Sequence, residues 1–256
     1  MNPDPPATGG RVLARGQCRE KYALRLAAGP EDIRAAQALR FEVFNLELRE
    51  GLAASYATRL DADPFDAVCD HLLVEEGVTR AVVGTYRLQS GLTAAARLGY
   101  YSEQEFVFAP FEPMRAQVIE LGRACVHRDH RNLSVLALLW KGIATYARER
   151  GGRYLIGCSS LTSQDPGDGA ALYAELQRRH LALPGLRTVP QPAYVCGLGH
   201  PTEPAPKIPR LLLAYLSFGA TICGPPAIDR EFKTIDFLTL MDLAALSPDI
   251  VARYLT

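Results

Sequence analysis

The sequence lacks the features on which several large classes of protein depend. Its 28 lysines and arginines balance 28 aspartates and glutamates, so no charge excess favours a nucleic-acid partner. Its six cysteines are scattered without a CxxC pair, and the polar N-terminus contains no apolar signal segment. These absences favour reduced thiols in a cytoplasmic protein and argue against a metal site.

Long hydrophobic runs are also missing. No stretch reaches the roughly 18 apolar residues that a membrane-spanning helix requires. The nearest, "IPRLLLAYLSFGATICG" at 208–224, is shorter and is interrupted by Ser217 and Gly219. It is interpreted either as a buried core helix or as a segment that lies on a membrane surface. We therefore expect a cytoplasmic protein and leave open a peripheral contact with the inner face of the cell membrane.

Hydrophobic periodicity alternates between strand and helix patterns along most of the chain. Residues 1–19, rich in Pro, Gly and Arg, predict a disordered leader, and 20–256 predict one domain with a C-terminal elaboration from about residue 190. The order of elements predicts an α/β fold, in which helices flank a mixed central sheet. Asp168 is expected to cap the third helix. Strands are expected at 21–27, 71–76, 81–88, 117–126, 153–160 and 233–240, and helices at 29–48, 133–152, 168–180 and 247–255.

Three ionisable residues, Arg87, Glu120 and Arg123, lie inside apolar strand patterns. Such groups are rarely buried unless they are paired, so they indicate either a structural ion pair or a functional site. In a regular strand, Glu120 and Arg123 would face opposite sides of the sheet. Gly122 between them predicts a β-bulge, which would bring both side chains to one cleft.

Three carboxylates crowd around Phe65 in the loop "DADPFD": Asp61, Asp63 and Asp66. Aspartates often accept hydrogen bonds from their own backbone in turns, so one interpretation of the loop is a plain turn. An anionic pocket for a cationic or amine-bearing substrate explains the same residues equally well. The sequence leaves both interpretations open.

A basic turn, "HRDHRN", separates the strand at 117–126 from the helix at 133–152. A helix N-terminus presents unpaired backbone amides and the positive end of its dipole, which suits a phosphate group. Arg128 and Arg131 add positive charge there, although a solvated basic turn is the simpler interpretation. Its position beside Glu120 favours the phosphate.

Together these motifs resemble two known groups of acyltransferases. The strand, basic turn and helix of 118–150 resemble the central motif of the GNAT superfamily. The segments "LRFEVF", "DADPFD", "VVGTYRL" and "ELGR" resemble acyl-homoserine-lactone synthases in order and approximate spacing. That resemblance implies that the matching residues line the site for the amine and the acyl donor. They are Arg40, Phe44, Asp63, Asp66, Arg87, Glu120 and Arg123.

From about residue 22 to the C-terminus, the chain is also similar to the L-ornithine Nα-acyltransferases, notably in "ALLWKGIATYA" and in 214–240. The resemblance implies a GNAT-like fold and transfer of a 3-hydroxy fatty acyl group from acyl carrier protein to the α-amine of L-ornithine, giving lyso-ornithine lipid. The acyl-phosphopantetheine of the carrier protein would be a co-substrate, with no other cofactor. The alternatives are an acyl-homoserine-lactone or other N-acyl amino acid synthase, and a non-catalytic module that binds acyl carrier protein or lipid.

The resemblance also assigns roles to residues. Glu120 would take a proton from the amine, with Arg123 as the second catalytic residue. Asp63 and Asp66 would hold the cationic ends of ornithine, while Arg40 or Arg87 would pair with its carboxylate or brace the aspartates. Acetyl-CoA-dependent members carry glycines where this chain has Ser134 and Leu136, which favours the single phosphate of a carrier protein. The residues expected to contact the acyl donor are Arg128, Arg131, Asn132 and Ser134.

Overall fold

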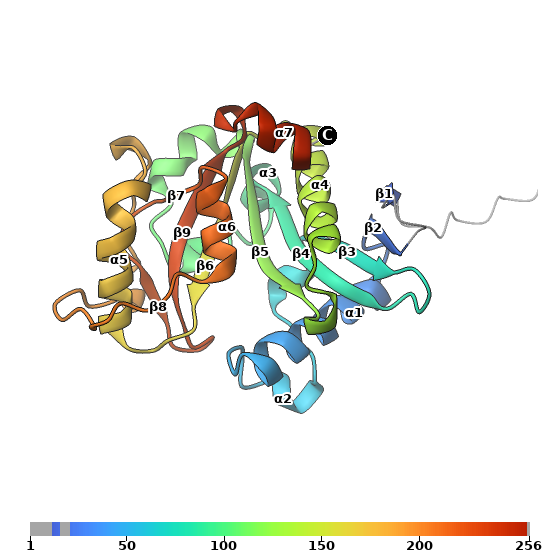
Figure 1. Cartoon of the computed structure of the whole chain (residues 1–256), viewed down its shortest axis with the longest axis horizontal. Helices are drawn as coiled ribbons and strands as arrows, with labels where there is room; N and C mark the ends of the chain where they lie inside the picture. The colour runs from blue at the N-terminus through green and yellow to red at the C-terminus, as the bar shows by residue number, and fades with distance from the viewer. Residues whose placement is uncertain (1–11, 16–20, 255–256) are drawn as a thin grey trace, which may run out of the picture.

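One mixed β-sheet forms the centre of the molecule (Figure 1). The computed structural model describes residues 12–15 and 21–254. The strand order is β1-β2-β3-β4-β5-β6-β9-β7, with β8 paired to β9. In this sheet β5 and β6 run parallel, and the other described neighbours are antiparallel. The strands are β1 (Val12–Arg15), β2 (Tyr22–Leu26), β3 (Asp70–Glu76), β4 (Val82–Ser90), β5 (Val118–Val126), β6 (Tyr154–Leu161), β7 (Thr221–Ile222), β8 (Ala227–Asp229) and β9 (Thr234–Asp242).

Helices cover both faces of this sheet, which confirms the α/β fold with a mixed central sheet (Figure 1). In Figure 1, α4 and α6 lie in front of the sheet, whereas α3 lies behind it. Beyond α1 the first helix continues as a π-helix, Phe41–Glu47. The α-helices are α1 (Pro30–Arg40), α2 (Ser55–Thr58), α3 (Gly91–Ala96), α4 (Leu133–Glu149), α5 (Pro166–His180), α6 (Arg210–Ser217) and α7 (Pro248–Tyr254).

Side-chain alternation along β5 divides the core into two layers. Ile119 points toward α4, where it joins Leu139, Trp140 and other buried residues in one apolar cluster. Its neighbour Val118 joins a second cluster, which includes Phe111, on the opposite face. Because successive side chains on a strand face opposite sides, Glu120 lies on the same face as Val118. This second face is therefore the one on which the charged residues of β5 are presented.

Two expectations from the sequence differ from the structure at helix and strand ends. Asp165, rather than Asp168, caps α5, because its carboxylate accepts the backbone N–H of Gly167 at 2.8 Å. Asp168 lies one turn inside and accepts a hydrogen bond from Ser163 instead. Most of the expected disordered leader, 1–19, lies outside the described residues, but Val12–Arg15 within it forms strand β1 against β2.

The apolar segment at 208–224 forms the short helix α6 followed by β7. Leu212, Tyr215 and Leu216 are buried, so this part of the segment is core, as the first of the two interpretations expected. Leu211 and Leu213 on the same helix are 37% and 52% exposed. No helix in the described part of the chain combines the length and apolarity needed to cross a membrane.

Candidate functional site

A β-bulge in β5 shapes the site. Opposite β4, Gly122 pairs with Arg87 and Cys125 pairs with Thr85, so β5 contains one more residue than its partner over this interval. Arg123 adopts a left-handed backbone conformation with φ of 48°. The predicted bulge is confirmed, although Arg123 rather than Gly122 takes the unusual φ. Bulges re-aim side chains in this way and are over-represented beside active sites.

The bulge brings Glu120 and Arg123 to the same residue, Tyr101. Oε2 of Glu120 accepts the backbone N–H of Tyr101 at 2.9 Å, and the Arg123 guanidinium lies 4.9 Å from the centre of the Tyr101 ring. The guanidinium also contacts the ring of Phe232 at 4.4 Å. Phe232 packs edge-on against Phe44, the apolar residue that the resemblance placed in the site. Both charged groups of the "ELGR" motif therefore face one region of the molecule.

Glu120 is 4% exposed, and both of its carboxylate oxygens are held in place. Oε1 accepts the backbone N–H of Ser102 at 2.8 Å, and Oε2 accepts the Gln89 side-chain amide at 2.6 Å as well as Tyr101. Oε1 retains a lone pair after these contacts, so Glu120 can still accept a proton at that oxygen. Its position is fixed by neighbouring groups rather than by a salt bridge.

The aspartates of the "DADPFD" loop are ion-paired with the arginines. Asp66 binds Arg40 at 2.6 Å and Arg87 at 3.0 Å. Asp63 binds Arg87 at 2.6 Å and Arg123 at 3.0 Å, and also caps the 3-10 turn Pro64–Ala67. Burial acts to raise the pKa of Asp66, but the hydrogen bonds and charge of Arg40 hold that pKa well below its usual value.

These ion pairs indicate whether Arg40 and Arg87 brace the aspartates or are available to bind the substrate carboxylate. Arg40 is 1% exposed, and it pairs with Asp61 at 2.8 Å in addition to Asp66, so it braces the loop. Of the two expectations for Arg40 and Arg87, the contacts favour bracing for Arg40. Arg87 also braces the loop, because its Nη1 binds Asp63 and Asp66, but its buried Nη2 has no hydrogen-bond partner among the described residues. That donor is free to bind a carboxylate.

A second group of carboxylates was not expected from the sequence. Glu105, Asp229 and Asp236 each offer an oxygen, and these oxygens lie within 4.8 Å of one another. All three residues are buried, and no lysine or arginine in the described part of the chain forms an ion pair with them. Burial raises the pKa of Asp236 to about 6. Asp236 interrupts the apolar strand "KTIDFLTL", which was the one sequence signal for this group.

The paired ladder of β5 and β6 ends at Glu120. Their parallel pairing covers Val118, Ile119 and Glu120, which face Tyr154, Leu155 and Ile156. Gly157 then passes so close to β5 that a Cβ atom there would lie 2.1 Å from the Leu121 carbonyl oxygen. A small cavity of about 30 Å³ lies at the point of separation and is lined mainly by apolar residues. They include Leu121, Trp140, Leu155, Tyr215 and Met241.

The basic turn lies at the far end of β5, at the entrance to α4. Asn132 caps α4, because its side-chain oxygen accepts the backbone N–H groups of Ser134 and Val135 at 3.0 and 3.1 Å. Arg131 is bound by Glu47 at 2.6 and 2.7 Å. A phosphate at this helix end would therefore take over the amides that Asn132 holds in this structure. The phosphate contact stays a prediction.

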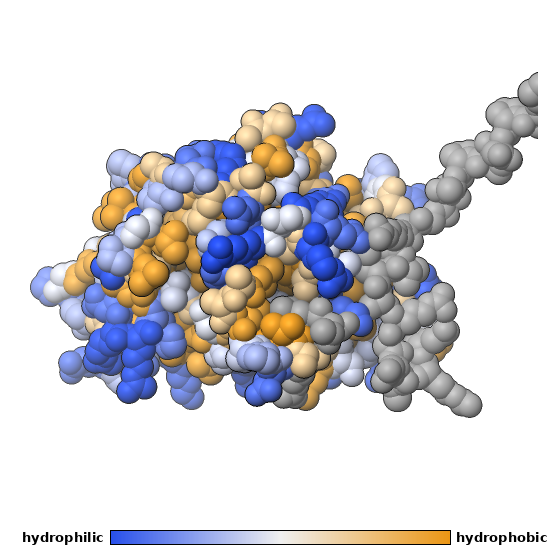
Figure 2. All heavy atoms as spheres, turned by 90° about the horizontal axis from the view of Figure 1, so that it is seen from above, coloured by the Kyte–Doolittle hydropathy of each residue, from blue (hydrophilic) through white to orange (hydrophobic). Residues whose placement is uncertain are grey.

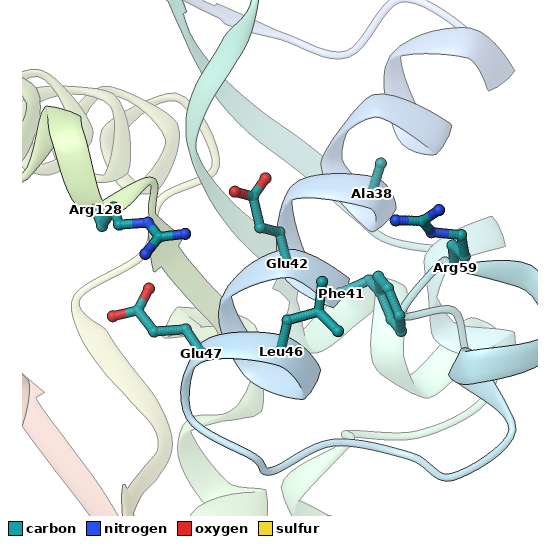
Figure 3. A pocket seen from close by; sticks show the side chains of 7 residues that line it. All are labelled: Ala38, Phe41, Glu42, Leu46, Glu47, Arg59 and Arg128. Carbon is teal, nitrogen blue, oxygen red and sulfur yellow. The ribbon is translucent and has the colours of Figure 1, made fainter.

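Arg128 lines a pocket with a volume of about 570 Å³. Figure 3 shows Arg128, Glu42 and Glu47 extending toward this space from two sides, with Phe41 and Leu46 along its apolar wall. Its lining residues do not include Glu120, the bulge or the second carboxylate group. The pocket is thus a feature of the outer side of the first helix, separate from Glu120 and the bulge.

Cys125 is not suited to nucleophilic catalysis. Its side chain is buried, and burial raises the pKa of its thiol. A nucleophilic cysteine needs a lowered pKa and an adjacent base. His127, the nearest histidine in sequence, contacts Glu42 at 3.2 Å instead. The structure therefore argues against Cys125 as the nucleophile of an acyl-enzyme.

The sequence of this chain is similar to those of known acyltransferases. Residues 39–141 match the family model of the acetyltransferase (GNAT) domain. The L-ornithine N(alpha)-acyltransferase of Rhodobacter capsulatus is 34% identical over 240 residues, covering 88% of this chain and 92% of that protein. The protein of the same name from Agrobacterium fabrum is 31% identical, covering 90% of this chain and 84% of that protein.

Solved structures show the same fold at low sequence identity. The acyl-homoserine-lactone synthase LasI has a TM-score of 0.53 and 12% identity, covering 91% of this chain and 94% of LasI. FeeM, an N-acyl amino acid synthase from uncultured soil microbes, has a TM-score of 0.52 and 12% identity, covering 88% of this chain and 91% of FeeM. Taken with the curated relatives, the bulged strand and its charged groups identify this chain as an acyltransferase with a GNAT-like fold that belongs to the L-ornithine Nα-acyltransferase family.

Proposed function

We propose that this enzyme transfers a 3-hydroxy fatty acyl group from acyl carrier protein to the α-amine of L-ornithine, forming lyso-ornithine lipid. The observation that carries the proposal is Glu120. It is a buried carboxylate held beside the bulge at Arg123, where the pairing of β5 and β6 ends. The names of the curated relatives support ornithine as the amine.

The chemistry follows from the charge of the substrate. An α-amine is largely protonated near neutral pH, so it must lose a proton before it attacks a thioester. Glu120 would accept that proton, directly or through a water molecule. The neutral nitrogen attacks the thioester carbonyl, and the carbon–sulfur bond breaks. The nitrogen then loses a second proton, which passes to the sulfur, so that phosphopantetheine leaves as a thiol. Arg87 and Arg123 would bind the ornithine carboxylate, because Arg87 Nη2 and Arg123 Nε have no hydrogen-bond partner within the described part of the chain.

The acyl donor would approach from the other side of the sheet opening. The cavity beside Trp140 and Tyr215 is apolar and lies where β5 and β6 separate. It is too small for an acyl chain as it stands, so we propose that α6 moves outward when the donor binds. Tyr86 of β4 and Tyr215 of α6 are joined by a hydrogen bond of 2.5 Å, which this movement would break.

Expression of the chain in a host without ornithine lipids tests the proposed function. Mass spectrometry of the extracted lipids should reveal an N-acylated ornithine, whose fragments give both the amine and the acyl group. A different N-acylated amino acid or a lactone would favour the alternative of another N-acyl amino acid synthase. No new lipid, together with retained binding of acyl carrier protein, would favour a non-catalytic binding module.

Docking of the acidic carrier protein should depend on Arg128. No carboxylate in the described residues forms an ion pair with Arg128, whereas Glu47 already binds Arg131. Arg128→Glu is therefore expected to slow association and to weaken its dependence on salt. Stopped-flow measurement at low and high ionic strength checks this, with the exposed α5 variant Arg178→Glu as the control. Equal association rates for the two variants at low salt would place docking elsewhere.

A peripheral membrane contact is proposed through α6. Leu211 and Leu213 are exposed, although hydrophobic residues on the face in Figure 2 lie in separate areas divided by hydrophilic ones. Burial of a leucine is worth about 1.5–3 kcal/mol, so Leu213→Asp should reduce pelleting with anionic liposomes by about tenfold or more. Phe218 packs on Trp140 at 5.2 Å, so Phe218→Asp should instead lower the melting temperature. Unchanged pelleting of Leu213→Asp would remove α6 from the contact.

A further inference from the structure

Three buried carboxylates lie outside the ion-paired network of the aspartate loop. Asp229 is at the end of β8, Asp236 is on β9, and Glu105 lies in the segment between α3 and β5. We call these residues the carboxylate triad. They are 3–8% exposed, and in the described structure none of them forms a salt bridge. Buried charges are normally paired, so three unpaired carboxylates together indicate a place for a cation.

Glu105 provides an independent sign that this group binds a ligand. Glu105 is only 3% exposed, yet among the described residues its carboxylate accepts a hydrogen bond only from the weak thiol donor of Cys158, at 3.8 Å. The other two members are supported: Asp236 accepts the hydroxyls of Ser160 and Thr234, and Asp229 accepts two backbone amides. Burial and the charges of Asp236 and Asp229 raise the pKa of Glu105 well above its usual value.

The triad lies on the Glu120 face of the sheet. Ile156 pairs with Glu120, and Cys158 lies two residues, about 7 Å, farther along β6. The Cys158 thiol contacts Glu105, and its pKa is raised by burial and by the charges of Glu105, Asp236 and Glu120. Arg123 acts on the same groups, because its charge opposes the rise in the pKa of both Glu105 and Asp236. The triad and the reacting groups therefore share one polar region.

We propose that the carboxylate triad binds the side-chain ammonium of the amine substrate. This inference rests on the proposed function. The α and δ nitrogens of ornithine are separated by four carbons, so a molecule lying along β6 can place its δ-ammonium at the triad and its α-amine at Glu120. The triad then explains both the choice of a diamino acid and the acylation of its α-nitrogen, because the δ-nitrogen is held as an ammonium and cannot attack.

The spacing of the oxygens is compatible with an ammonium. The three oxygens lie within 4.8 Å of one another. An ammonium that donates hydrogen bonds of about 2.8 Å can join oxygens within this limit. An ammonium also leaves the hydroxyl and amide contacts of Asp236 and Asp229 in place.

The test compares L-ornithine with L-norleucine, in which a methyl group replaces the δ-ammonium. The ratio of kcat/KM for ornithine to that for norleucine is measured in wild type, Glu105→Gln, Asp236→Asn and the control Glu112→Gln, an exposed acid of the same segment. The triad variants should lower the ratio roughly 10- to 100-fold, the range for a lost hydrogen bond to a charged group, and the control should keep it. An unchanged ratio in both triad variants overturns the inference.

A binding measurement keeps the test independent of turnover and of any loss of fold in the variants. In wild type without acyl donor, ornithine should raise the melting temperature more than norleucine does at equal concentration. Equal shifts contradict the inference, as does tight binding of Mg²⁺ or Ca²⁺ that is lost in Glu105→Gln while the substrate ratio stays constant. If wild type binds ornithine through the triad but never acylates it, the proposed function fails and the triad assignment stands.

Discussion

Glu120→Gln is expected to lower kcat for acyl transfer by about 10²- to 10⁴-fold, the usual contribution of a general base. The glutamine has nearly the shape of the glutamate, and its carbonyl oxygen can still accept from Tyr101 and Gln89, whereas the hydrogen bond from the Ser102 N–H is lost. Steady-state kinetics with purified protein measure the effect. Circular dichroism and thermal melting should confirm that the variant is folded.

The pH profile separates a base from a merely structural carboxylate. If Glu120 removes the proton from the amine, the activity of Glu120→Gln should rise steeply with pH, because an increasing fraction of the amine is then already neutral. The control Glu112→Gln, which alters an exposed glutamate, should follow the wild-type profile. Near-normal turnover of Glu120→Gln at neutral pH would remove Glu120 from the mechanism.

Arg40→Ala is expected to reduce the free energy of unfolding by about 3–5 kcal/mol, the cost of leaving buried charges without their partner. Arg40 is 1% exposed and binds two aspartates, Asp61 and Asp66, which are themselves 0% and 4% exposed. Removal of the guanidinium leaves Asp61 with Arg123 at 3.4 Å and Asp66 with Arg87 as their remaining cations. Urea denaturation gives the change in stability.

The matched control is Arg34→Ala, which removes an exposed arginine two turns earlier on the same helix. A surface change of this kind should alter the stability by no more than about 0.5 kcal/mol. If Arg40→Ala cost as little as Arg34→Ala, the buried network would not be holding the loop, and the bracing role assigned to Arg40 would be wrong.

The sequence identified the site residues that depend on local pattern. Glu120 and Arg123 were identified because ionisable groups are rarely buried in an apolar strand unless they are paired or functional. The bulge predicted from Gly122 is present. The exact residue with a positive φ was not predictable, because it depends on how the Arg123 side chain pairs with Asp63. Local chemistry predicted the existence of the bulge, and tertiary contacts decided its details.

The sequence was less informative about long-range partners. The sequence left the loop carboxylates open between a plain turn and an anionic pocket, because the pattern "DADPFD" does not reveal that three arginines from α1, β4 and β5 converge on it. The carboxylate triad escaped notice for the same reason. Glu105 is more than a hundred residues from Asp229 and Asp236, and the three meet only because β9 returns to pair with β6.

Transfer to purified components tests the central claim most directly. Wild-type protein is incubated with 3-hydroxyacyl–acyl carrier protein and L-ornithine, and the product is identified by mass spectrometry with fragmentation that distinguishes the two nitrogens. Nα-(3-hydroxyacyl)-ornithine should accumulate in wild type and fall by at least about a hundredfold with Glu120→Gln. Acylation of the δ-nitrogen, or no acylation of ornithine while another amine is acylated, would contradict the account.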